Sequence, residues 1–309
     1  MKKREDKENK FIEAIKKWFE KYKISYLFML PYGILFIIFI ITPVITSVYL
    51  SFTYFNVLES PSWVGWTNYR LLFLEDKVWL TAIKNSLIFA GITGPGSMLG
   101  SFVFAWLINQ LRYKTAWTLA FYTPSIVSGI AMSVVWMYLF SGDRYGLLNH
   151  WLIRLGILND PVLWLENAKT MLPSVMMVTF WMSMGTSFLV FLAGLQNVPP
   201  FLYEAGRVDG IENKFQEVWH ITLPLIKPQL LFGAVMAIVN SFTVFDIAMQ
   251  LTGFPSPQYA CRTFVSHLYD YGFVRFEMGY ASAIAVVLFG LTFGLSRICM
   301  RIFSTRGEY

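Results

Sequence analysis

The stretch Glu204-Ala205-Gly206-Arg207-Val208-Asp209-Gly210, closed by Ile221-Thr222-Leu223-Pro224, lies between two long apolar runs at 171–195 and 229–251. It carries acidic and basic side chains, and it is much longer than a simple connection between two membrane helices needs to be. Gly210 stands where a short helix needs a terminator, because glycine adopts the left-handed conformation without penalty. Prolines before and after the stretch restrain the chain on both sides. These features favour a helix-turn-helix segment over an ordinary solvated loop.

The rest of the chain is predominantly apolar. Of its 309 residues, 56% are hydrophobic and only 14% are charged, which indicates a polytopic membrane protein. Six apolar segments each exceed the roughly 20 residues that a helix needs to cross a bilayer. They lie at 27–50, 80–108, 117–140, 171–195, 229–251 and 279–302. Because these runs are too long and too continuous for barrel strands, we predict an all-α protein with six transmembrane helices.

The basic residues predict the topology. With the N-terminus inside, 17 of the 25 Lys and Arg residues fall in cytoplasmic segments and 8 fall outside. This positive-inside bias predicts that both termini and the 199–228 loop are cytoplasmic. The net charge of +6 is therefore a topology signal and not the footprint of a nucleic-acid partner.

Three parts of the chain are expected: a cytoplasmic basic segment at 1–24, a six-helix membrane domain at 25–303 that includes the 199–228 loop, and a cytoplasmic tail at 304–309. Apolar residues recur at helical spacing in the first part, which predicts an amphipathic helix at the inner interface, with a disordered basic tail as the alternative. These residues are Phe11, Ile15, Trp18, Phe19 and Tyr22. The run that follows is too long for a signal peptide and lacks a small-residue cleavage site.

Signatures of an enzyme are missing from the sequence. It contains no Gly-rich phosphate loop followed by Lys-Ser/Thr, no nucleophile elbow and no catalytic triad. His150, His220 and His267 are isolated and have no metal-ligand spacing. Cys261 and Cys299 are expected on opposite sides of the membrane, so no disulfide framework exists. We therefore expect neither catalytic residues nor a cofactor or metal on this chain.

Two spans carry unusual residues. Gly94-Pro95-Gly96 is expected to kink or break the second span, either around a pathway or for packing. In the fifth span, Asp246 lies 18 residues beyond Pro228, about 27 Å along a helix and near the outer edge of the bilayer. An ionisable residue at that depth is a functional candidate or a cap for the following loop. Asn240 lies close to the midplane and is the better candidate for a polar contact on a translocation path.

The loop resembles the "EAA" coupling loop of bacterial ABC importer membrane subunits, in which two short helices dock into a cleft on a cytoplasmic ATPase. Gly206 replaces the usual Ala, and ten residues rather than nine separate Gly210 from Ile221. The resemblance implies an ATPase contact made by Glu204, Ala205, Gly206, Asp209, Gly210, Ile221, Leu223 and Pro224.

The similarity covers about residues 25–303 and is specific to first-permease-type subunits of carbohydrate importers, of the maltose, lactose and glycerol-3-phosphate kind. No large external domain interrupts the chain, unlike in the maltose protein, since 141–170 spans only 30 residues. The matching motifs are Leu30-Pro31, Pro43, Ser51-Phe52, Val64-Gly65, Asn68-Tyr69, Gly146-Leu147-Leu148-Asn149, Phe245-Asp246, Leu251-Thr252-Gly253, Pro255, Pro257 and Gly279-Tyr280-Ala281-Ser282-Ala283.

This resemblance implies a type I ABC importer permease in a bacterial cytoplasmic membrane, importing a carbohydrate, with an oligosaccharide favoured. Its expected partners are a second homologous permease, two cytoplasmic ATPase subunits that hold ATP and Mg, an extracytoplasmic solute-binding protein, the sugar and membrane lipid. Substrate would cross by alternating access coupled to the ATPases through the 199–228 loop.

Sugars are bound by aromatic faces and neutral hydrogen-bonding groups. The candidates for the pathway are Tyr138, Trp181, Asn240, Asp246 and Gln250, with lipid-interface anchoring as the alternative for Trp181. Three other functions stay open. A glycerol-3-phosphate-type importer would be expected to show an inward-facing Arg, and an ion-driven transporter would show inverted repeats and buried carboxylates. A scaffold that carries no solute fits the polar fifth span less well.

Overall fold

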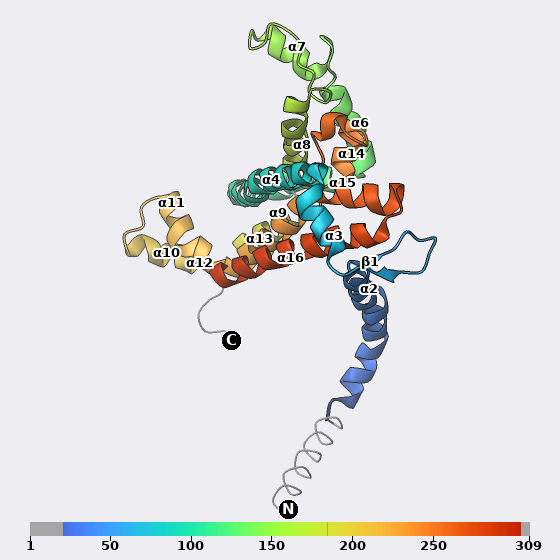
Figure 1. Ribbon diagram of the computed structural model, residues 1–309. Coiled ribbons are helices and arrows are strands. Elements are labelled where there is room, and N and C mark those ends of the chain that lie inside the picture. Colours follow the sequence, from blue (N-terminus) through green and yellow to red (C-terminus); the bar gives the residue numbers. More distant parts are fainter. Residues whose placement is uncertain (1–20, 184, 304–309) are drawn as a thin grey trace, which may run out of the picture.

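The computed structural model describes residues 21–183 and 185–303 (Figure 1). Three helices in this part are long and apolar enough to span a membrane: Lys21–Leu50, α4 at Lys77–Asn109 and α16 at Met278–Phe303. They match the first, second and sixth apolar runs of the sequence. The first of them includes a π-helical turn, η1 at Ile37–Ile41, and ends in α2 at Thr42–Leu50.

The third and fourth apolar runs form bent pairs of helices instead of single helices. α5 (Lys114–Ile126) and α6 (Gly129–Leu139) meet at 97°, and α8 (Ala168–Met182) and α9 (Thr186–Gln196) meet at 41°. Val127 has an extended backbone, which ends α5 and changes the direction of the chain. The described residues therefore contain three spans, or up to six if each bent pair counts as one.

The expected fifth helix at 229–251 is interrupted. α13 ends at Phe242, and α14 begins at Asp246 and ends at Thr252. The prediction of one continuous helix is wrong here, because one local and one tertiary hydrogen bond stabilise the break. Thr243 Oγ1 donates to the Val239 carbonyl of the preceding helical turn at 2.8 Å, and Thr263 Oγ1 donates to the Val244 carbonyl from a distant part of the chain at 3.0 Å. A third bend of 82° lies before α13, where the helical segment Lys214–Leu225 meets Lys227–Phe242.

The second span, in contrast to the fifth, forms one continuous helix. Gly94-Pro95-Gly96 does not break α4, which runs without interruption past Pro95. Membrane helices tolerate proline where neighbouring groups satisfy the local backbone, and Ser97 Oγ donates to the Gly94 carbonyl at 3.0 Å. Gly94 itself lies against α13, since a Cβ there would approach Ser241 Oγ to 3.4 Å.

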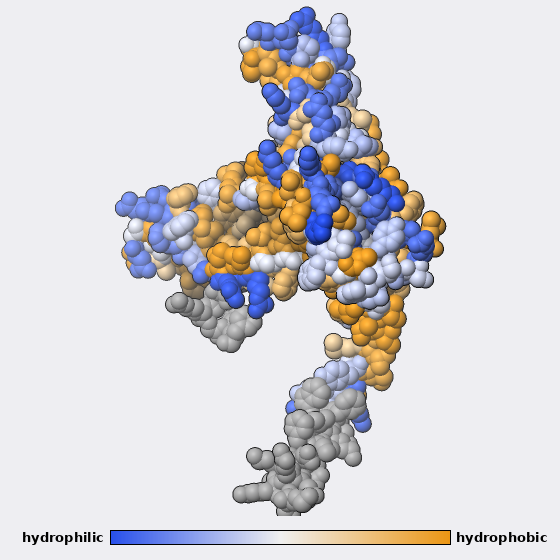
Figure 2. Space-filling model, in the orientation of Figure 1, coloured by the Kyte–Doolittle hydropathy of each residue, from blue (hydrophilic) through white to orange (hydrophobic). Residues whose placement is uncertain are grey.

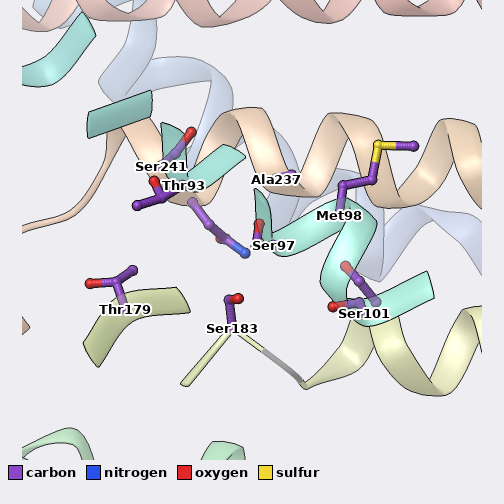
Figure 3. A pocket seen from close by; sticks show the side chains of 10 residues that line it. Thr93, Ser97, Met98, Ser101, Thr179, Ser183, Ala237 and Ser241 are labelled. Carbon is purple, nitrogen blue, oxygen red and sulfur yellow. The ribbon is translucent and has the colours of Figure 1, made fainter. Parts of the chain in front are cut away.

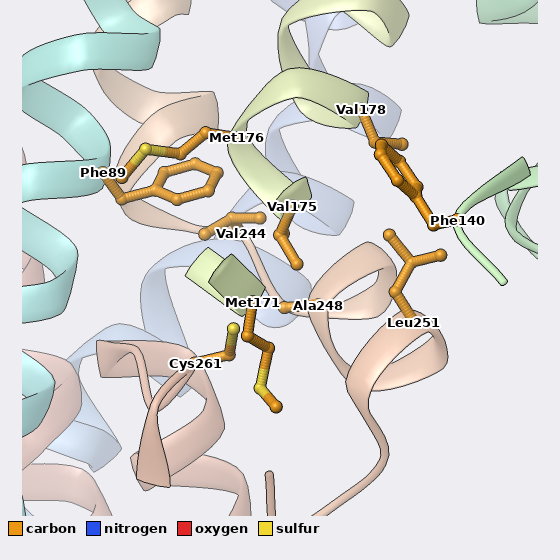
Figure 4. Packing of buried hydrophobic residues seen from close by; sticks show 10 residues of the cluster. All are labelled: Phe89, Phe140, Met171, Val175, Met176, Val178, Val244, Ala248, Leu251 and Cys261. Atoms are coloured by element: carbon orange, nitrogen blue, oxygen red, sulfur yellow. The ribbon is translucent and has the colours of Figure 1, made fainter. Parts of the chain in front are cut away.

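α4 is the central helix of the domain and packs against α8, α9 and α13, while α16 packs against α2, α13 and α15. Three buried apolar clusters surround it. The first joins α4 and α8 to α14 and is shown in Figure 4, with Phe89, Val175 and Leu251 among its members. The second joins α4 to α15 and α16, and the third joins α4 to α9 and α13.

Short elements connect the spans. The strands β1 (Thr53–Tyr54) and β2 (Ser62–Trp63) form a small antiparallel hairpin, which an all-α prediction does not include. Gly279 allows α16 to begin against β1, because a Cβ there would overlap the Thr53 carbonyl. The remaining connecting elements are α3 (Thr67–Arg70), η2 (Leu71–Glu75), α7 (Leu147–Arg154), η4 (Pro257–Tyr259), α15 (Phe264–Tyr269) and η5 (Asp270–Val274).

The first helix extends away from the body of the domain, and its surface is largely hydrophobic over the upper part (Figures 1 and 2). Its apolar span has no buried residue within the described chain. Such a surface fits contact with lipid or with another membrane subunit. The amphipathic helix expected within 1–24 and the tail at 304–309 fall, apart from residues 21–24, outside the described residues.

Candidate functional site

The 199–228 loop forms two short helical segments, as the sequence predicts. α10 covers Pro200–Val208, and the second segment runs through α11 (Lys214–Glu217), η3 (Val218–Thr222) and α12 (Leu223–Leu225). Gly210 has a φ of +92°, so it ends α10 in the left-handed conformation. The N–H of Ile211 donates to the Gly206 carbonyl at 2.9 Å, and the N–H of Gly210 donates to the Arg207 carbonyl at 3.3 Å. This pair of bonds is a Schellman motif.

Gly206 determines how closely the two segments approach. A Cβ at this position would lie 2.7 Å from Ile221 Cδ1 and 3.1 Å from Ile211 Cδ1. The structure thus brings Gly206 and Ile221 of the predicted set into contact with each other. Their contact defines the angle between the two helical segments and leaves little room for a larger residue.

Glu217 is an additional residue of the loop that the sequence prediction did not include. Its side chain is nearly buried and forms ion pairs with Lys214 Nζ at 2.7 Å and Arg207 Nε at 3.5 Å. Because Arg207 lies on α10 and Glu217 on α11, the second pair links the two segments. The i,i+3 spacing of Lys214 and Glu217, beside the capping box of Asn213 and Gln216, was the available sequence signal.

The outer surface of the loop is apolar as well as charged. Phe201, Val208, Phe215 and Trp219 are 63%, 88%, 76% and 63% exposed. Glu204, Ala205, Asp209 and Pro224 of the predicted set are also exposed, whereas Ile221 and Leu223 are partly buried. Exposed apolar side chains on a polar segment are typical of a protein-binding surface. The predicted residues therefore divide into a packed group and an accessible group.

A second feature lies within the helical domain. Hydroxyl-bearing residues recur every four positions along α4 and along the α8–α9 pair, so that each set lies on one helical face. Together with residues of α13 they surround a cavity of about 30 Å³ (Figure 3). Its polar lining consists of Thr93, Ser97, Ser101, Thr179, Ser183, Ser187, Asn240 and Ser241.

Two of these hydroxyls lack a protein partner. Within the described part of the chain, neither Ser101 Oγ nor Thr179 Oγ1 has a hydrogen-bond partner, although both atoms are buried. A buried hydroxyl without a partner costs free energy. The cavity therefore contains hydrogen-bonding capacity that water or a ligand can use.

Of the five predicted pathway residues, the structure places only Asn240 at this cavity. Tyr138 is 69% exposed on α6, and Trp181 makes an edge contact with Trp136 at 5.5 Å between ring centroids. Gln250 accepts a 2.6 Å hydrogen bond from Ser133 and so links α14 to α6. Asp246 is exposed at the first position of α14, where a carboxylate is favoured by the helix dipole. The signal for the cavity, hydroxyls at spacing four on two helices, was present in the sequence but was not used.

A network of charged and polar side chains lies at the N-terminal end of α4, and its charged members lie outside the spans. Asp76 caps α4 and accepts hydrogen bonds from Tyr271 at 3.1 Å, Tyr280 at 2.9 Å and His267 Nε2 at 3.0 Å. Arg262 Nε donates to His267 Nδ1 at 3.3 Å, and its Nη2 pairs with Asp270. These bonds join the start of α4 to α15, η5 and α16. Within the described residues no group of His, Cys, Asp and Glu could hold a metal ion.

The ionisation of this network follows from burial. Burial lowers the pKa of His267 to about 4, against the opposing influence of Asp76. The imidazole is therefore neutral near pH 7, which agrees with Nε2 donating to Asp76 and Nδ1 accepting from Arg262. Burial acts to raise the pKa of Asp76, but the Trp79 N–H, Tyr280 and His267 outweigh it and hold this pKa below its usual value.

We expect acid to destabilise the network. Above pH 6.5 His267 is neutral in both folded and unfolded chains; as the pH falls from about 6.5 toward 4, only the unfolded chain gains the proton. The loss should reach about 2 kcal/mol at pH 5. Thermal unfolding of the purified complex between pH 7.5 and 5 measures it. His267→Gln should flatten this pH dependence, and His150→Gln, at an exposed position, should not. An unchanged pH dependence in His267→Gln would contradict the assignment.

The sequence is similar to known proteins over most of its length. The family described as "Binding-protein-dependent transport system inner membrane component" matches residues 34–306. A probable ABC transporter permease protein of Bacillus subtilis strain 168, YesP, is 33% identical over 268 residues, covering 85% of each chain. The arabinooligosaccharides transport system permease protein AraP of the same organism is 31% identical over 295 residues, covering 94% of this chain and 92% of that one.

A solved structure shares the fold. The crystal structure of a bacterial alginate ABC transporter, in complex with a periplasmic protein bound to an alginate pentasaccharide, contains a chain that superposes with a TM-score of 0.76. It is 23% identical in sequence, and the match covers 94% of this chain and 98% of that chain. At this identity the likeness supports the arrangement of helices alone.

Proposed function

The chain belongs to the inner membrane components of binding-protein-dependent transport systems and is a carbohydrate ABC importer permease, and we propose that it imports an oligosaccharide. It is a transporter subunit and not an enzyme, because ATP hydrolysis in such importers belongs to a separate subunit. In this proposal, ATP and Mg bind to two cytoplasmic ATPases, and an extracytoplasmic binding protein delivers the sugar. A second, homologous permease completes the membrane domain.

The observation that carries the proposed coupling to an ATPase is the structure of the 199–228 loop. Gly206, Ile221 and Glu217 fix two helical segments relative to each other, and the segments present exposed apolar side chains such as Phe215 and Trp219. A rigid element with an accessible apolar surface is suited to transmit motion from a partner protein. We propose that Glu204, Ala205, Asp209, Gly210 and neighbouring residues contact the ATPase.

The proposed topology has six spans in a bacterial cytoplasmic membrane, with both termini and the coupling loop in the cytoplasm. The asymmetric distribution of Lys and Arg supports it. The third and fourth spans would be bent pairs of helices, and the fifth would be interrupted between α13 and α14. Near the bends of the third and fourth spans, Ser125 Oγ and Ser183 Oγ donate to the Tyr122 and Phe180 carbonyls.

The cavity lined by Asn240 is proposed to belong to the translocation path in a closed state. A cavity of about 30 Å³ has room for water but not for a sugar. Passage of a sugar therefore requires the helices around the cavity to separate. Alternating access supplies such a motion if each state of the ATPase binds the two permease conformations with different affinity.

Uptake by membrane vesicles tests the proposed function. Vesicles that contain the complete importer, given binding protein with sugar outside and ATP inside, should accumulate the sugar without an ion gradient. Vesicles given an ion gradient without ATP should not. Accumulation driven by the ion gradient alone would replace this proposal with secondary transport.

The Asn240 side chain should matter for the path. Asn240→Leu removes an amide that lines the cavity, so we expect sugar uptake to fall by roughly 3–10-fold, the effect of one neutral hydrogen bond. Val239→Leu, one position earlier on the same helix and outside the lining, is the matched control. Initial uptake rates, normalised to the amount of permease in the membrane, provide the measurement. If uptake is unchanged in Asn240→Leu, this residue does not belong to the pathway.

A further inference from the structure

The cavity between α4, α8–α9 and α13 has no charged side chain in its lining. Its polar groups are hydroxyls, such as those of Ser97 and Ser183 (Figure 3), and the single amide of Asn240. The helices that supply them are uncharged for long distances. The sequence contains no Asp, Glu, Lys, Arg or His within 85–111, 170–203 and 228–245.

Four of the basic side chains near the two ends of these helices are paired with acids. On one side Arg262 and Arg275 both bind Asp270, and on the other side Arg207 and Lys214 both bind Glu217. The other basic side chains near these helix ends, among them Lys84, Arg112, Lys169 and Lys227, lie outside the lining of the cavity. An anionic substrate would therefore find no counter-charge among the residues of this chain that line the cavity.

Ser101 and Thr179 point to a ligand more directly. Ser101 is fully buried, both side chains line the cavity, and neither hydroxyl has a partner within the described residues. A hydroxyl can both donate and accept, so these groups can pair with a sugar hydroxyl in either direction. They cannot compensate a full charge, because moving an ion from water into a site with only neutral dipoles costs several kcal/mol.

We propose that this cavity is a binding site for an uncharged, polyhydroxylated substrate, and that it excludes phosphorylated and carboxylated sugars. The inference rests on the proposed function and adds the charge class of the substrate. Ser101 and Thr179 act as contact residues, since their hydroxyls gain partners only when substrate or water enters.

Uptake by a deletion strain tests the charge class. Cells that lack this gene, and the same cells carrying it on a plasmid, are given labelled neutral di- and trisaccharides, the corresponding oligo-uronates and glycerol 3-phosphate. We expect gene-dependent uptake of at least one neutral sugar and none of the anions. Gene-dependent uptake of an anion would overturn the charge class and leave the proposed carbohydrate import intact. If the uptake of neither the neutral sugars nor the anions depends on this gene, the proposed carbohydrate import would be overturned.

Variants of the two hydroxyls test the site itself. With the neutral sugar found above, Ser101→Ala and Thr179→Val should each lower the uptake rate about 3–10-fold, the effect of one neutral hydrogen bond. Ser101→Asp should lower it further, by more than 10-fold. Thr118→Val is the control, because that hydroxyl bonds to the Lys114 carbonyl within its own helix at 2.8 Å.

Assembly is measured in the same samples by co-purification of the ATPase. A variant that assembles normally and transports at the wild-type rate would remove its residue from the site. If Ser101→Asp fails to assemble, Thr179→Val and Ser101→Ala decide the outcome, because neither introduces a charge.

Discussion

Gly210→Asp should abolish ATP-driven sugar uptake while the external binding protein still binds the sugar. Gly210 ends α10 with a φ of +92°, a conformation that costs about 1–2 kcal/mol for a residue with a side chain. A Cβ at this position meets nothing within 4 Å in this chain, so packing inside the loop does not forbid it. The expected loss therefore comes from the altered backbone and from a charged side chain in the proposed ATPase contact. Uptake by ATP-loaded vesicles should fall at least 100-fold.

The chain contains a matched control for this substitution. Gly156 follows α7 with a φ of +71°, also has open space around a built Cβ, and closes the same type of motif with Ile157 N–H bonded to the Leu152 carbonyl at 2.9 Å. Gly156→Asp thus imposes a similar backbone cost at a site far from the coupling loop. We expect it to change uptake by less than threefold. If both variants lose transport equally, the effect of Gly210→Asp is one of stability and not of coupling.

A second series separates backbone from contact at Gly210 itself. Asparagine tolerates the left-handed region better than other residues with a side chain, whereas alanine does not. Gly210→Asn therefore keeps the turn but adds a larger side chain at the proposed ATPase contact. Gly210→Ala strains the turn and adds only a methyl group at that contact. Loss of uptake in Gly210→Asn with normal protein levels would support the contact. Wild-type uptake in Gly210→Asp, driven by ATP, would contradict the coupling role.

The sequence predicted the two helical segments of the 199–228 loop because their determinants are local. Gly210 ends a helix through its own backbone preference, and Pro200 occupies the first turn of α10, where proline is favoured. The small residue at 206 was read as allowing close approach, and the contact with Ile221 shows which approach it allows. Glu217 was missed because its role depends on Arg207, ten positions away on another helix.

The helix breaks were harder to predict because they depend on distant partners. The apolar run at 229–251 has no feature that ends a helix at Phe242, and the break is stabilised by Thr263, which bonds to the Val244 carbonyl. Of the kink or break expected at Pro95, the break does not occur, since this strong local breaker lies within an unbroken helix. In a membrane protein, apolar length predicts where spans lie, and tertiary hydrogen bonds decide whether each span is continuous.

The pathway residues show a similar limit. Trp181 and Gln250 were chosen for their chemistry alone, but one packs on Trp136 and the other bonds to Ser133. Ser97 and Ser101 carried a more useful signal, since a four-residue spacing places two hydroxyls on one face of α4. Which face turns inward depends on how α4 packs against α9 and α13, and this information is not local.

Expressed without a second permease, the chain should aggregate or be degraded. On α13, Asn240 and Thr243 are exposed, although Asn240 lies deep within the fifth apolar run. A polar side chain that faces lipid is costly, so a water-filled path or another subunit must cover this face. On α16, Gly290 and Gly294 are exposed and a Cβ at either meets nothing within 4 Å. Glycines four apart favour close contact between membrane helices.

Co-expression tests this expectation. The amount of this chain in detergent-solubilised membranes should rise at least tenfold when the second permease is produced with it. Gly290→Ile and Gly294→Ile should reduce co-purification of the second permease, because a large side chain separates the two helices. Gly91→Ile is the control, since Gly91 is also exposed with open space but lies on α4. A stable homodimer that transports sugar with the ATPase alone would overturn the heterodimer, because the polar face of α13 would then be covered by a second copy of the same chain.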